Sequence, residues 1–198
     1  MRPDVSRETR SRLERFVALL LQWNRRINLI ASSDEADIWT RHIADSLQLV
    51  PIIPPGIARA VDIGSGAGFP GLVLALVTGI SWDLIESDQR KASFLREAAR
   101  VTGASVRIHP IRAEAAAIEP AGLVTARGFA SLAKLLPIAS RLMAPGGTGL
   151  FPKGETALRE LTDARRQWHM AVDHVPSQTP GGGTILIVRD IRPADAAG

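Results

Sequence analysis

The chain has 198 residues, of which 45% are hydrophobic, enough for one domain together with a packed arm. It contains no Cys, which excludes disulfides and thiolate zinc sites, and its four His residues show no metal-ligand spacing. No apolar run approaches the ~18 residues of a membrane span, and the charged N-terminus is unlike a signal peptide, so we expect a cytoplasmic protein.

The first 26 residues carry the whole net charge of +4. They hold seven Arg and three acidic residues, whereas the remainder is balanced at 17 against 17. A basic segment on a neutral body indicates a polyanionic partner, although a solvated helix face has the same composition. Apolar residues in this segment recur at i, i+3, i+4 and i+7, which predicts an amphipathic helix over 7–27 that packs on the main body.

A second, interrupted helix is expected up to about Val50. Ser33, followed by Asp34 and Glu35, is typical of an N-cap with acids in the first turn. The Pro- and Gly-containing run 51–56 then marks a boundary before the sheet. The predicted division has three parts: an N-terminal helical arm over 1–55 packed on the body, a main domain over 56–191, and a disordered tail over 192–198.

The stretch 59–71, RAVDIGSGAGFPG, is the most informative part of the chain. An apolar run with one embedded acid breaks into glycines and continues into an apolar stretch of helical length, which predicts strand, tight turn and helix. Glycine lets a ligand approach the main chain, and the following helix points its N-terminus at that ligand. The glycines are Gly64, Gly66, Gly68 and Gly71.

Two ligand classes use such a turn. The last three glycines match the G-x-G-x-x-G spacing of dinucleotide-binding proteins by count, a weak signal alone. Asp62, two residues before Gly64, instead resembles the acid of the D-x-G-x-G-x-G loop of class I methyltransferases, which helps to hold the methionyl end of S-adenosylmethionine (SAM). Glu86 follows 22 positions after Gly64, where an acid can bind a ribose diol. A glycine-rich surface turn without a ligand is the remaining alternative.

Strand and helix patterns alternate beyond this loop, which predicts a mostly parallel sheet with helices on both faces. The turn at 180–183 joins the last two strands too directly for a parallel crossover, so the last strand should be antiparallel. The expected fold is α/β: a class I SAM-dependent methyltransferase (Rossmann-like) fold with a seven-stranded sheet and an N-terminal helical arm. The predicted strands are 59–63, 82–86, 105–109, 122–126, 147–152, 168–174 and 184–189, and the predicted helices after the arm are 70–78, 88–102, 131–143 and 154–166.

Ligands of such sheets bind outside the carboxyl ends of the strands. After the third strand, Ala113 and Glu114 occupy the place where a main-chain amide and an acid usually hold adenine, although Glu114 can also be a helix N-terminal acid. Phe69 can close over the ligand or pack on the next helix. After the fourth strand there is neither an [N/D]-P-P-aromatic motif of amino-methylating enzymes nor a Cys nucleophile. Arg127 stands there instead, and it can bind a carboxylate or phosphate bidentately but cannot act as a base.

Four motifs occur in order along the chain: Trp23-Asn24…Asn28-Leu29, RHIADSL over 41–47, DIGSGAGFPG over 62–71, and RGFASL over 127–132. With these motifs the chain resembles, over nearly its full length, the bacterial small-subunit rRNA methyltransferase G family, also called glucose-inhibited division protein B. The resemblance implies SAM-dependent methylation of N7 of a guanine, guanine 527, in the 530 loop of 16S rRNA. The expected partner is 16S rRNA, the small ribosomal subunit or its assembly intermediate, and we expect a monomer. The resemblance also implies that Gly64, Phe69, Ala113, Glu114 and Arg127 contact SAM. Gly128 and Ile30 depart mildly from the family pattern.

The combined prediction for the cofactor site is Asp62, Gly64, Gly66, Gly68, Phe69, Glu86, Ala113, Glu114 and Arg127, with no metal. Arg127 is the expected catalytic residue through positioning alone, because guanine N7 has a lone pair and no proton to lose. The resemblance places His42 and Asp45 at the rim of the pocket. We favour the alternative that they form hydrogen bonds which dock the arm on the sheet.

Three alternatives stay open at this point: a small-molecule methyltransferase, an NAD-dependent oxidoreductase, and a non-catalytic RNA-binding module. The basic arm disfavours the first, and Asp62 disfavours the second. The form of the RNA substrate, free or within an assembling or finished subunit, also stays open.

Overall fold

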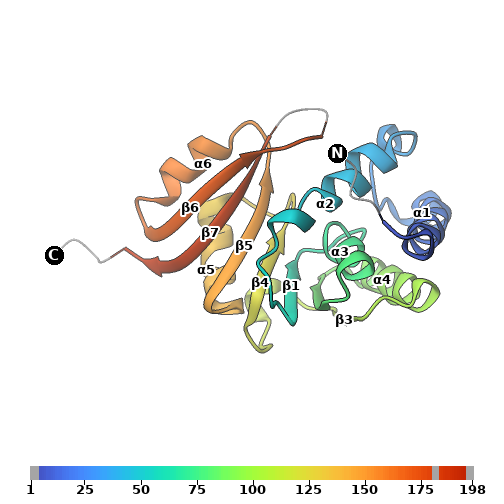
Figure 1. Ribbon diagram of the computed structural model, residues 1–198, viewed down its shortest axis with the longest axis horizontal. Coiled ribbons are helices and arrows are strands. Elements are labelled where there is room, and N and C mark those ends of the chain that lie inside the picture. The colour runs from blue at the N-terminus through green and yellow to red at the C-terminus, as the bar shows by residue number, and fades with distance from the viewer. Residues whose placement is uncertain (1–4, 180–182, 195–198) are drawn as a thin grey trace.

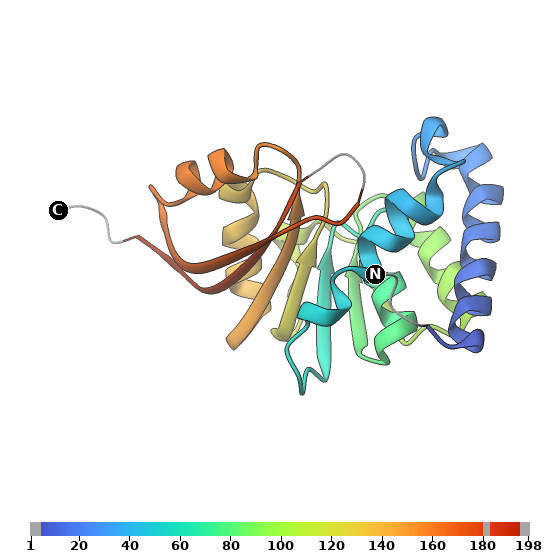
Figure 2. The same ribbon diagram turned by 45° about the horizontal axis from the view of Figure 1, so that its top comes forward.

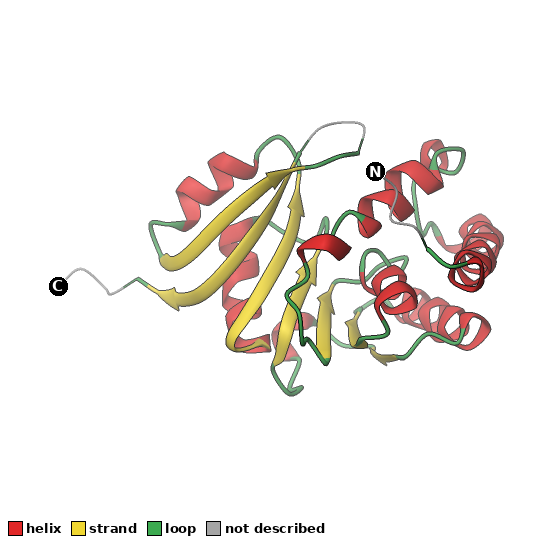
Figure 3. Cartoon of the chain, viewed as in Figure 1, coloured by secondary structure: helices red, strands yellow, loops and turns green. Residues whose placement is uncertain are grey.

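One seven-stranded sheet forms the framework of the protein (Figure 1, Figure 3). The computed structural model describes residues 5–179 and 183–194. Strands follow one another across the sheet in the order β3-β2-β1-β4-β5-β7-β6. The strands are β1 (Arg59–Ile63), β2 (Ser81–Ile85), β3 (Val106–His109), β4 (Ala121–Ala126), β5 (Met143–Lys153), β6 (Trp168–Pro176) and β7 (Thr184–Pro193). The predicted seven-stranded sheet is confirmed.

β1 and β4 mark the place where the strand order reverses. β1 pairs in parallel with β2 on one side and with β4 on the other. The chain therefore builds outward from β1 to β3, then returns and builds outward in the opposite direction. Such a reversal leaves a crevice at the carboxyl ends of the central strands, because the helices that follow them lie on opposite faces.

Helices cover both faces of the sheet. α1 (Arg7–Ile27), α3 (Gly71–Thr78) and α4 (Gln89–Thr102) lie on one face, and α5 (Leu132–Leu142) and α6 (Ala157–Ala164) lie on the other (Figure 2). Alternate strand residues point to opposite faces of the sheet. Ala60 and Leu84 pack in the core under α1, α3 and α4, and Val61 and Ile85 pack in the core under α5 and α6. No helix in the described ranges is long and apolar enough to cross a membrane.

β7 pairs antiparallel with both β5 and β6, as the short connection from β6 predicts. The glycine turn 180–182 lies outside the described residues. β7 continues to Pro193, and the amide of Ala194 donates to the carbonyl of Gln167 at 2.8 Å. The prediction of a disordered tail from residue 192 is therefore wrong for 192–194, because β6 supplies pairing partners as far as Trp168. Residues 195–198 lie outside the described part of the chain.

The amphipathic helix predicted over 7–27 is α1, and its apolar stripe is buried on α3 and α4. Phe16 is fully buried, and its ring centroid lies 5.5 Å from that of Phe69 and 6.2 Å from that of Phe94. Arg12 donates to the carbonyl of Thr102 at 2.7 Å and to that of Gly103 at 2.6 Å. One of the basic residues of the arm is thus part of its attachment to the body.

The second helical stretch is broken into short turns, as expected: η1 (Ser32–Asp34), the π-helical η2 (Trp39–Ala44), α2 (Asp45–Leu47) and η3 (Val50–Ile52). The predicted N-cap at Ser33 is wrong, since Ala31 precedes the first turn and no side chain caps it. Asn24 holds this turn instead. Its Oδ1 accepts from the amides of Leu29 and Ile30 at 2.7 and 3.0 Å, and its Nδ2 donates to Glu35 at 2.6 Å.

Candidate cofactor site

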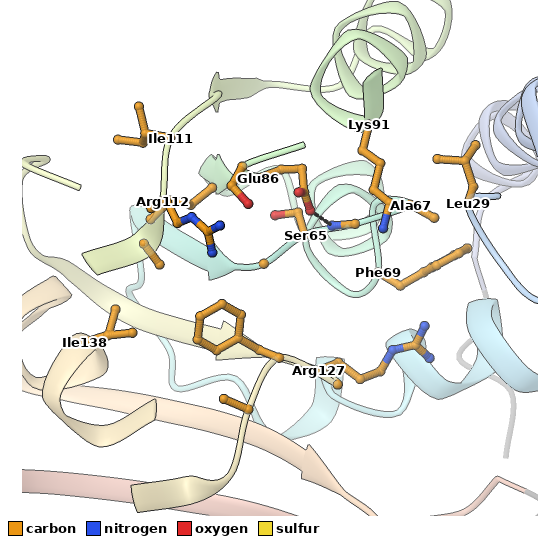
Figure 4. Close-up of a pocket in the computed structure, with 18 of the residues that line it drawn as sticks. Leu29, Ser65, Ala67, Phe69, Glu86, Lys91, Ile111, Arg112, Arg127 and Ile138 are labelled. Carbon is orange, nitrogen blue, oxygen red and sulfur yellow. Dashed lines mark hydrogen bonds between the residues drawn. The ribbon is translucent and has the colours of Figure 1, made fainter. Parts of the chain in front are cut away.

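A cavity of about 520 Å³ opens at the carboxyl ends of β1, β2 and β4 (Figure 4). It lies in the crevice between the two helical layers, where an open α/β sheet binds its ligand. Its wall combines the loop after β1, the end of β2, the turn after β3 and the loop after β4. Seven of the nine predicted cofactor residues line it: Gly64, Gly66, Phe69, Glu86, Ala113, Glu114 and Arg127.

The loop after β1 is held close to the sheet and leaves space above it. The amides of Gly64 and Ser65 both donate to the carbonyl of Ile85, at 2.9 and 3.0 Å. Gly64 has a φ of +70°, and a Cβ at this position would lie 2.5 Å from the ring of Phe129. Only glycine satisfies both conditions, so this position keeps the floor of the cavity open.

Two predicted cofactor residues, Asp62 and Gly68, do not line the cavity. The Asp62 carboxylate is fully buried and accepts from the amide of Gly71 at 3.2 Å and from the hydroxyl of Thr125 at 2.7 Å. Burial raises the pKa of Asp62 to about 6, against the opposing effect of these hydrogen bonds. A Cβ on Gly68 would meet Phe16 at 3.3 Å, on the side of the arm. The Asp62 carboxylate thus holds the loop and the start of α3, and its part in holding SAM stays a prediction.

Glu86 fastens the loop and also faces the cavity. One carboxylate oxygen accepts from the amide of Gly66 at 2.9 Å, the dashed bond in Figure 4, and the other accepts from the amide of Asp88 at 2.7 Å. A carboxylate has about four acceptor positions, so capacity remains for two hydroxyl groups. The structure thus places a charged acceptor where the sequence predicts a partner for a ribose diol.

Ala113 and Glu114 lie in the single turn η4 (Ala113–Ala115) at another wall of the cavity. Arg141 of α5 donates to the carbonyls of Ala113 and Glu114 at 3.0 and 2.8 Å. Sequence analysis did not single out Arg141, since its partners lie 28 and 27 residues away. The apolar side chains of Ile111 and Ile138 complete a slot beside this turn (Figure 4).

Arg127 joins the cofactor cavity to the arm. Its Nη1 donates to Asp45 at 2.7 Å and to the carbonyl of Arg41 at 3.2 Å, and its Nη2 donates to Nδ1 of His42 at 2.8 Å. Its guanidinium lies 5.2 Å from the ring centroid of Phe69. Among the described residues its Nε and second Nη2 hydrogen have no hydrogen-bond partner. These two N–H groups can donate to one planar anion, such as a carboxylate.

His42 and Asp45 dock the arm on the sheet, which is the role we favoured. The His42 ring also lines the cavity and stacks on Phe69 with centroids 4.8 Å apart. Burial, and then the charge of Arg127, lowers the pKa of His42. The neutral ring, with Nδ1 unprotonated, is the form that can accept this hydrogen bond from Arg127. Its Nε2 is buried without a hydrogen bond to any described residue; the nearest carboxylate oxygen, of Asp34, lies 3.4 Å away.

Three basic residues of the cavity wall had no predicted role: Lys91, Arg112 and Lys134. Lys91 reaches the cavity from the first turn of α4, and Arg112 from the turn before η4; both side chains point inward in Figure 4. Lys91 lies six residues after the end of β2 and Arg112 three residues after the end of β3, on the side of the sheet where parallel strands gather functional side chains. With Arg127 and Lys134 they give the wall more cations than acids.

The groups of this cavity fit SAM. Ile111 and Ile138 give an apolar slot beside the Ala113–Glu114 turn, Glu86 gives a charged acceptor, and Arg127 gives an open donor edge. The glycine floor, which a Cβ at Gly64 would close, admits a ligand near the main chain. In the described ranges no group of three acidic or His side chains is placed to hold a metal ion.

Two solved structures illustrate the proteins that share this fold. The ribosomal protein L11 methylase of Lactobacillus delbrueckii subsp. bulgaricus matches with a TM-score of 0.61 at 14% identity, covering 76% of this chain and 79% of that one. TYW2 of M. jannaschii, solved in complex with AdoMet, matches with a TM-score of 0.59 at 14% identity, covering 79% and 78%. With the antiparallel β7 and the glycine loop, this likeness assigns the class I SAM-dependent methyltransferase fold.

Sequence comparison then shows the family. The model of the rRNA small subunit methyltransferase G family (GidB) matches residues 9–182. The ribosomal RNA small subunit methyltransferase G of Rhodospirillum centenum is 54% identical over 189 residues, covering 96% of this chain and 88% of that protein. Its counterpart in Gluconobacter oxydans is 51% identical over 188 residues, covering 95% and 97%. The chain belongs to the rRNA small subunit methyltransferase G family, which confirms the resemblance found in its motifs.

Proposed function

We propose that this protein transfers a methyl group from SAM to N7 of a guanine in the 530 loop of 16S rRNA. The observation that carries the proposal is the cavity at the β1–β4 reversal, faced by Glu86 and Arg127, in a chain of an rRNA methyltransferase family. Family membership supports SAM-dependent methylation of rRNA. The nucleotide and the atom that is methylated are the finer part of the proposal.

Three parts of the cavity wall would hold the cofactor, which supplies an electrophilic methyl group when bound. Glu86 would accept from the ribose hydroxyls, and the turn at Ala113 and Glu114 would hold the adenine beside Ile111. The open edge of Arg127 would bind the methionyl carboxylate or a phosphate of the RNA. These roles use acceptor positions of Glu86 and donor positions of Arg127 that the hydrogen bonds within the protein leave free.

Transfer to N7 needs no general base. SAM would supply the methyl group. The new N–C bond would use the in-plane lone pair of N7, the electrons of the broken C–S bond would pass to sulfur, and the methylated guanine would stay in the RNA as a cation that has no proton to lose. The acid-base groups of the cavity agree with this chemistry: Glu86 accepts two amides, and Nδ1 of His42 accepts from Arg127. Catalysis would then rest on holding N7 close to the methyl group and in line with the departing sulfur.

The exposed face of α1 is the proposed path for the RNA backbone. Arg12 is bound to the body, whereas Arg7, Arg15, Arg25 and Arg26 are exposed. Their charges would attract phosphates and make binding depend on salt. We further propose that the protein acts as a monomer in the cytoplasm, where its rRNA substrate is made and assembled.

Mass spectrometry of 16S rRNA from cells with and without this protein tests the proposed function. The expected result is one 7-methylguanine in the 530 loop that disappears with the protein and returns when it is restored. Methyl transfer from labelled SAM is then compared between free 16S rRNA and assembled small subunits. The form that accepts the methyl group is the substrate. An unchanged pattern of methylation would contradict the proposal.

A further inference from the structure

A second hollow, of about 310 Å³, adjoins the cofactor cavity. Arg127 and Gly128 line both, so the two spaces meet at the loop after β4. Its other walls include Arg41 from the arm, and Lys153 and Gly154 from the carboxyl end of β5. We infer that this basic hollow binds a phosphate of the RNA strand next to the guanine that is methylated. The inference deepens the proposed function and rests on it.

Three cations line the basic hollow, and a carboxylate holds each of them in place. Arg41 pairs with Asp34 at 3.2 Å, Arg127 with Asp45 at 2.7 Å, and Lys153 with Glu160 at 2.9 Å. Of these carboxylates, only Asp45 contributes to the wall of the hollow. Cations therefore outnumber acids on the wall, and because their side chains are already positioned, less rotamer freedom is lost when an anion binds.

The remaining wall suits a phosphodiester rather than an apolar group. Thr184 contributes a hydroxyl group, and two glycines leave the main chain accessible. The hydroxyls of Ser177 and Thr179, in contrast, bond to each other at 2.8 Å, and that of Thr179 donates to Asp45 at 3.0 Å. Gly128 has a φ of +63°, and a Cβ there would have no described atom within 4 Å. Hydroxyl groups, main-chain amides and Arg or Lys side chains are the usual partners of nucleic-acid phosphates.

The position of the hollow explains what such a contact would do. Phosphate contacts carry no base information, but they fix the register of the strand on the protein. A phosphate held between Arg41 and Lys153 would set the distance from the strand to the cofactor cavity across Gly128. The guanine attached to that strand could then enter the cavity with its N7 toward the transferred methyl group. The contact acts by positioning the strand.

Gly154 allows a test in which only charge differs. It has ordinary backbone angles, and a Cβ there would have no described atom within 4 Å, so a side chain fits. Gly154→Asp places a carboxylate in the hollow, and Gly154→Asn places the same volume without the charge. At low salt, the KM for the rRNA substrate should be about tenfold higher for Asp than for Asn, because like charges repel at close range. Equal KM values in the two variants would overturn the inference.

Arg41→Gln provides a second, independent measurement. Loss of one phosphate contact should reduce the slope of log KM against log salt by about 0.7–0.9. Arg100→Gln is the matched control: this exposed Arg also pairs with an acid, Glu97, but lies at the far end of α4, away from the carboxyl ends of the strands. An Arg41→Gln slope equal to that of Arg100→Gln would likewise overturn the inference.

Calorimetry with SAM separates this inference from the proposed function. All four variants should bind SAM as the wild type does, since none of their side chains lines the cofactor cavity. If the wild type methylates rRNA while the charge and salt effects are absent, the inference fails and the proposed function stands. If the wild type transfers no methyl group to any form of the rRNA, the proposed function itself fails.

Discussion

Removal of the Glu86 carboxylate should weaken SAM binding by a predictable amount. Glu86 is 8% exposed, and it accepts two main-chain amides while facing the cavity. Hydrogen bonds from a ligand diol to a buried carboxylate contribute ~1.5–3 kcal/mol. Glu86→Ala should therefore raise the Kd for SAM by roughly 10–150-fold. The amides of Gly66 and Asp88 also lose their acceptor, so the variant should be less stable by about 1–3 kcal/mol.

A ligand control separates diol recognition from damage to the loop. Calorimetry would compare S-adenosylhomocysteine with its 2′,3′-dideoxy analogue on the wild type and on Glu86→Ala. The analogue should bind the wild type weakly and should lose little further affinity in the variant, since the hydroxyl partner is already missing. Glu97→Ala, which removes an acid from the surface of α4, is the control for net charge. An unchanged Kd in folded Glu86→Ala, or an equal loss for both ligands, would refute the assigned role.

Three further predictions concern the mechanism, the loop and the arm. The single-turnover rate at saturating SAM and rRNA should be nearly flat between about pH 6 and 9 in quench-flow, and Arg127→Ala should lower the rate without adding a pH dependence. Because burial raises the pKa of Asp62 to about 6, its folded form holds a proton that the unfolded form loses near 3.8. The contribution of this group to stability is therefore fully present below pH 3.8 and lost as pH rises through 6. Relative to Asp62→Asn, the free energy of unfolding of the wild type should rise by up to about 3 kcal/mol between pH 7 and 4, measured by urea denaturation. Replacing Arg25 and Arg26 with Gln should reduce the salt slope of rRNA binding by ~0.7–0.9 for each lost phosphate contact and leave SAM affinity unchanged.

Distinct results would contradict these three predictions. The mechanism would require a titrating base if the rate rose about tenfold per pH unit and if mutation of His42 or Glu114 abolished that rise. A difference between wild type and Asp62→Asn that stays constant with pH would mean that the Asp62 carboxylate has an ordinary pKa in the folded protein. A salt slope unchanged by the two Arg substitutions would make the arm a solvated face with only a packing role.

Local pattern alone determined the order of the elements and the kind of site. The helix over 7–27 and the strand at 59–63 match α1 and β1 at both ends, because hydrophobic periods of 3.6 and 2 are properties of neighbouring residues. The glycines after β1 identified the loop for the same reason, since backbone freedom belongs to the residue itself. The short connection before the last strand was enough to predict its antiparallel direction.

Only the tertiary structure decided which way the functional side chains face. Asp62 is two residues from the cavity floor at Gly64, yet the pleat of β1 turns its carboxylate toward Thr125 on the neighbouring strand. Arg127 takes its partners from the arm, 82 residues away at Asp45 and 85 at His42. The basic hollow likewise exists only where the arm meets the ends of β4 and β5. Such contacts depend on strand register and on the docking of distant segments, and no pattern among adjacent residues encodes either.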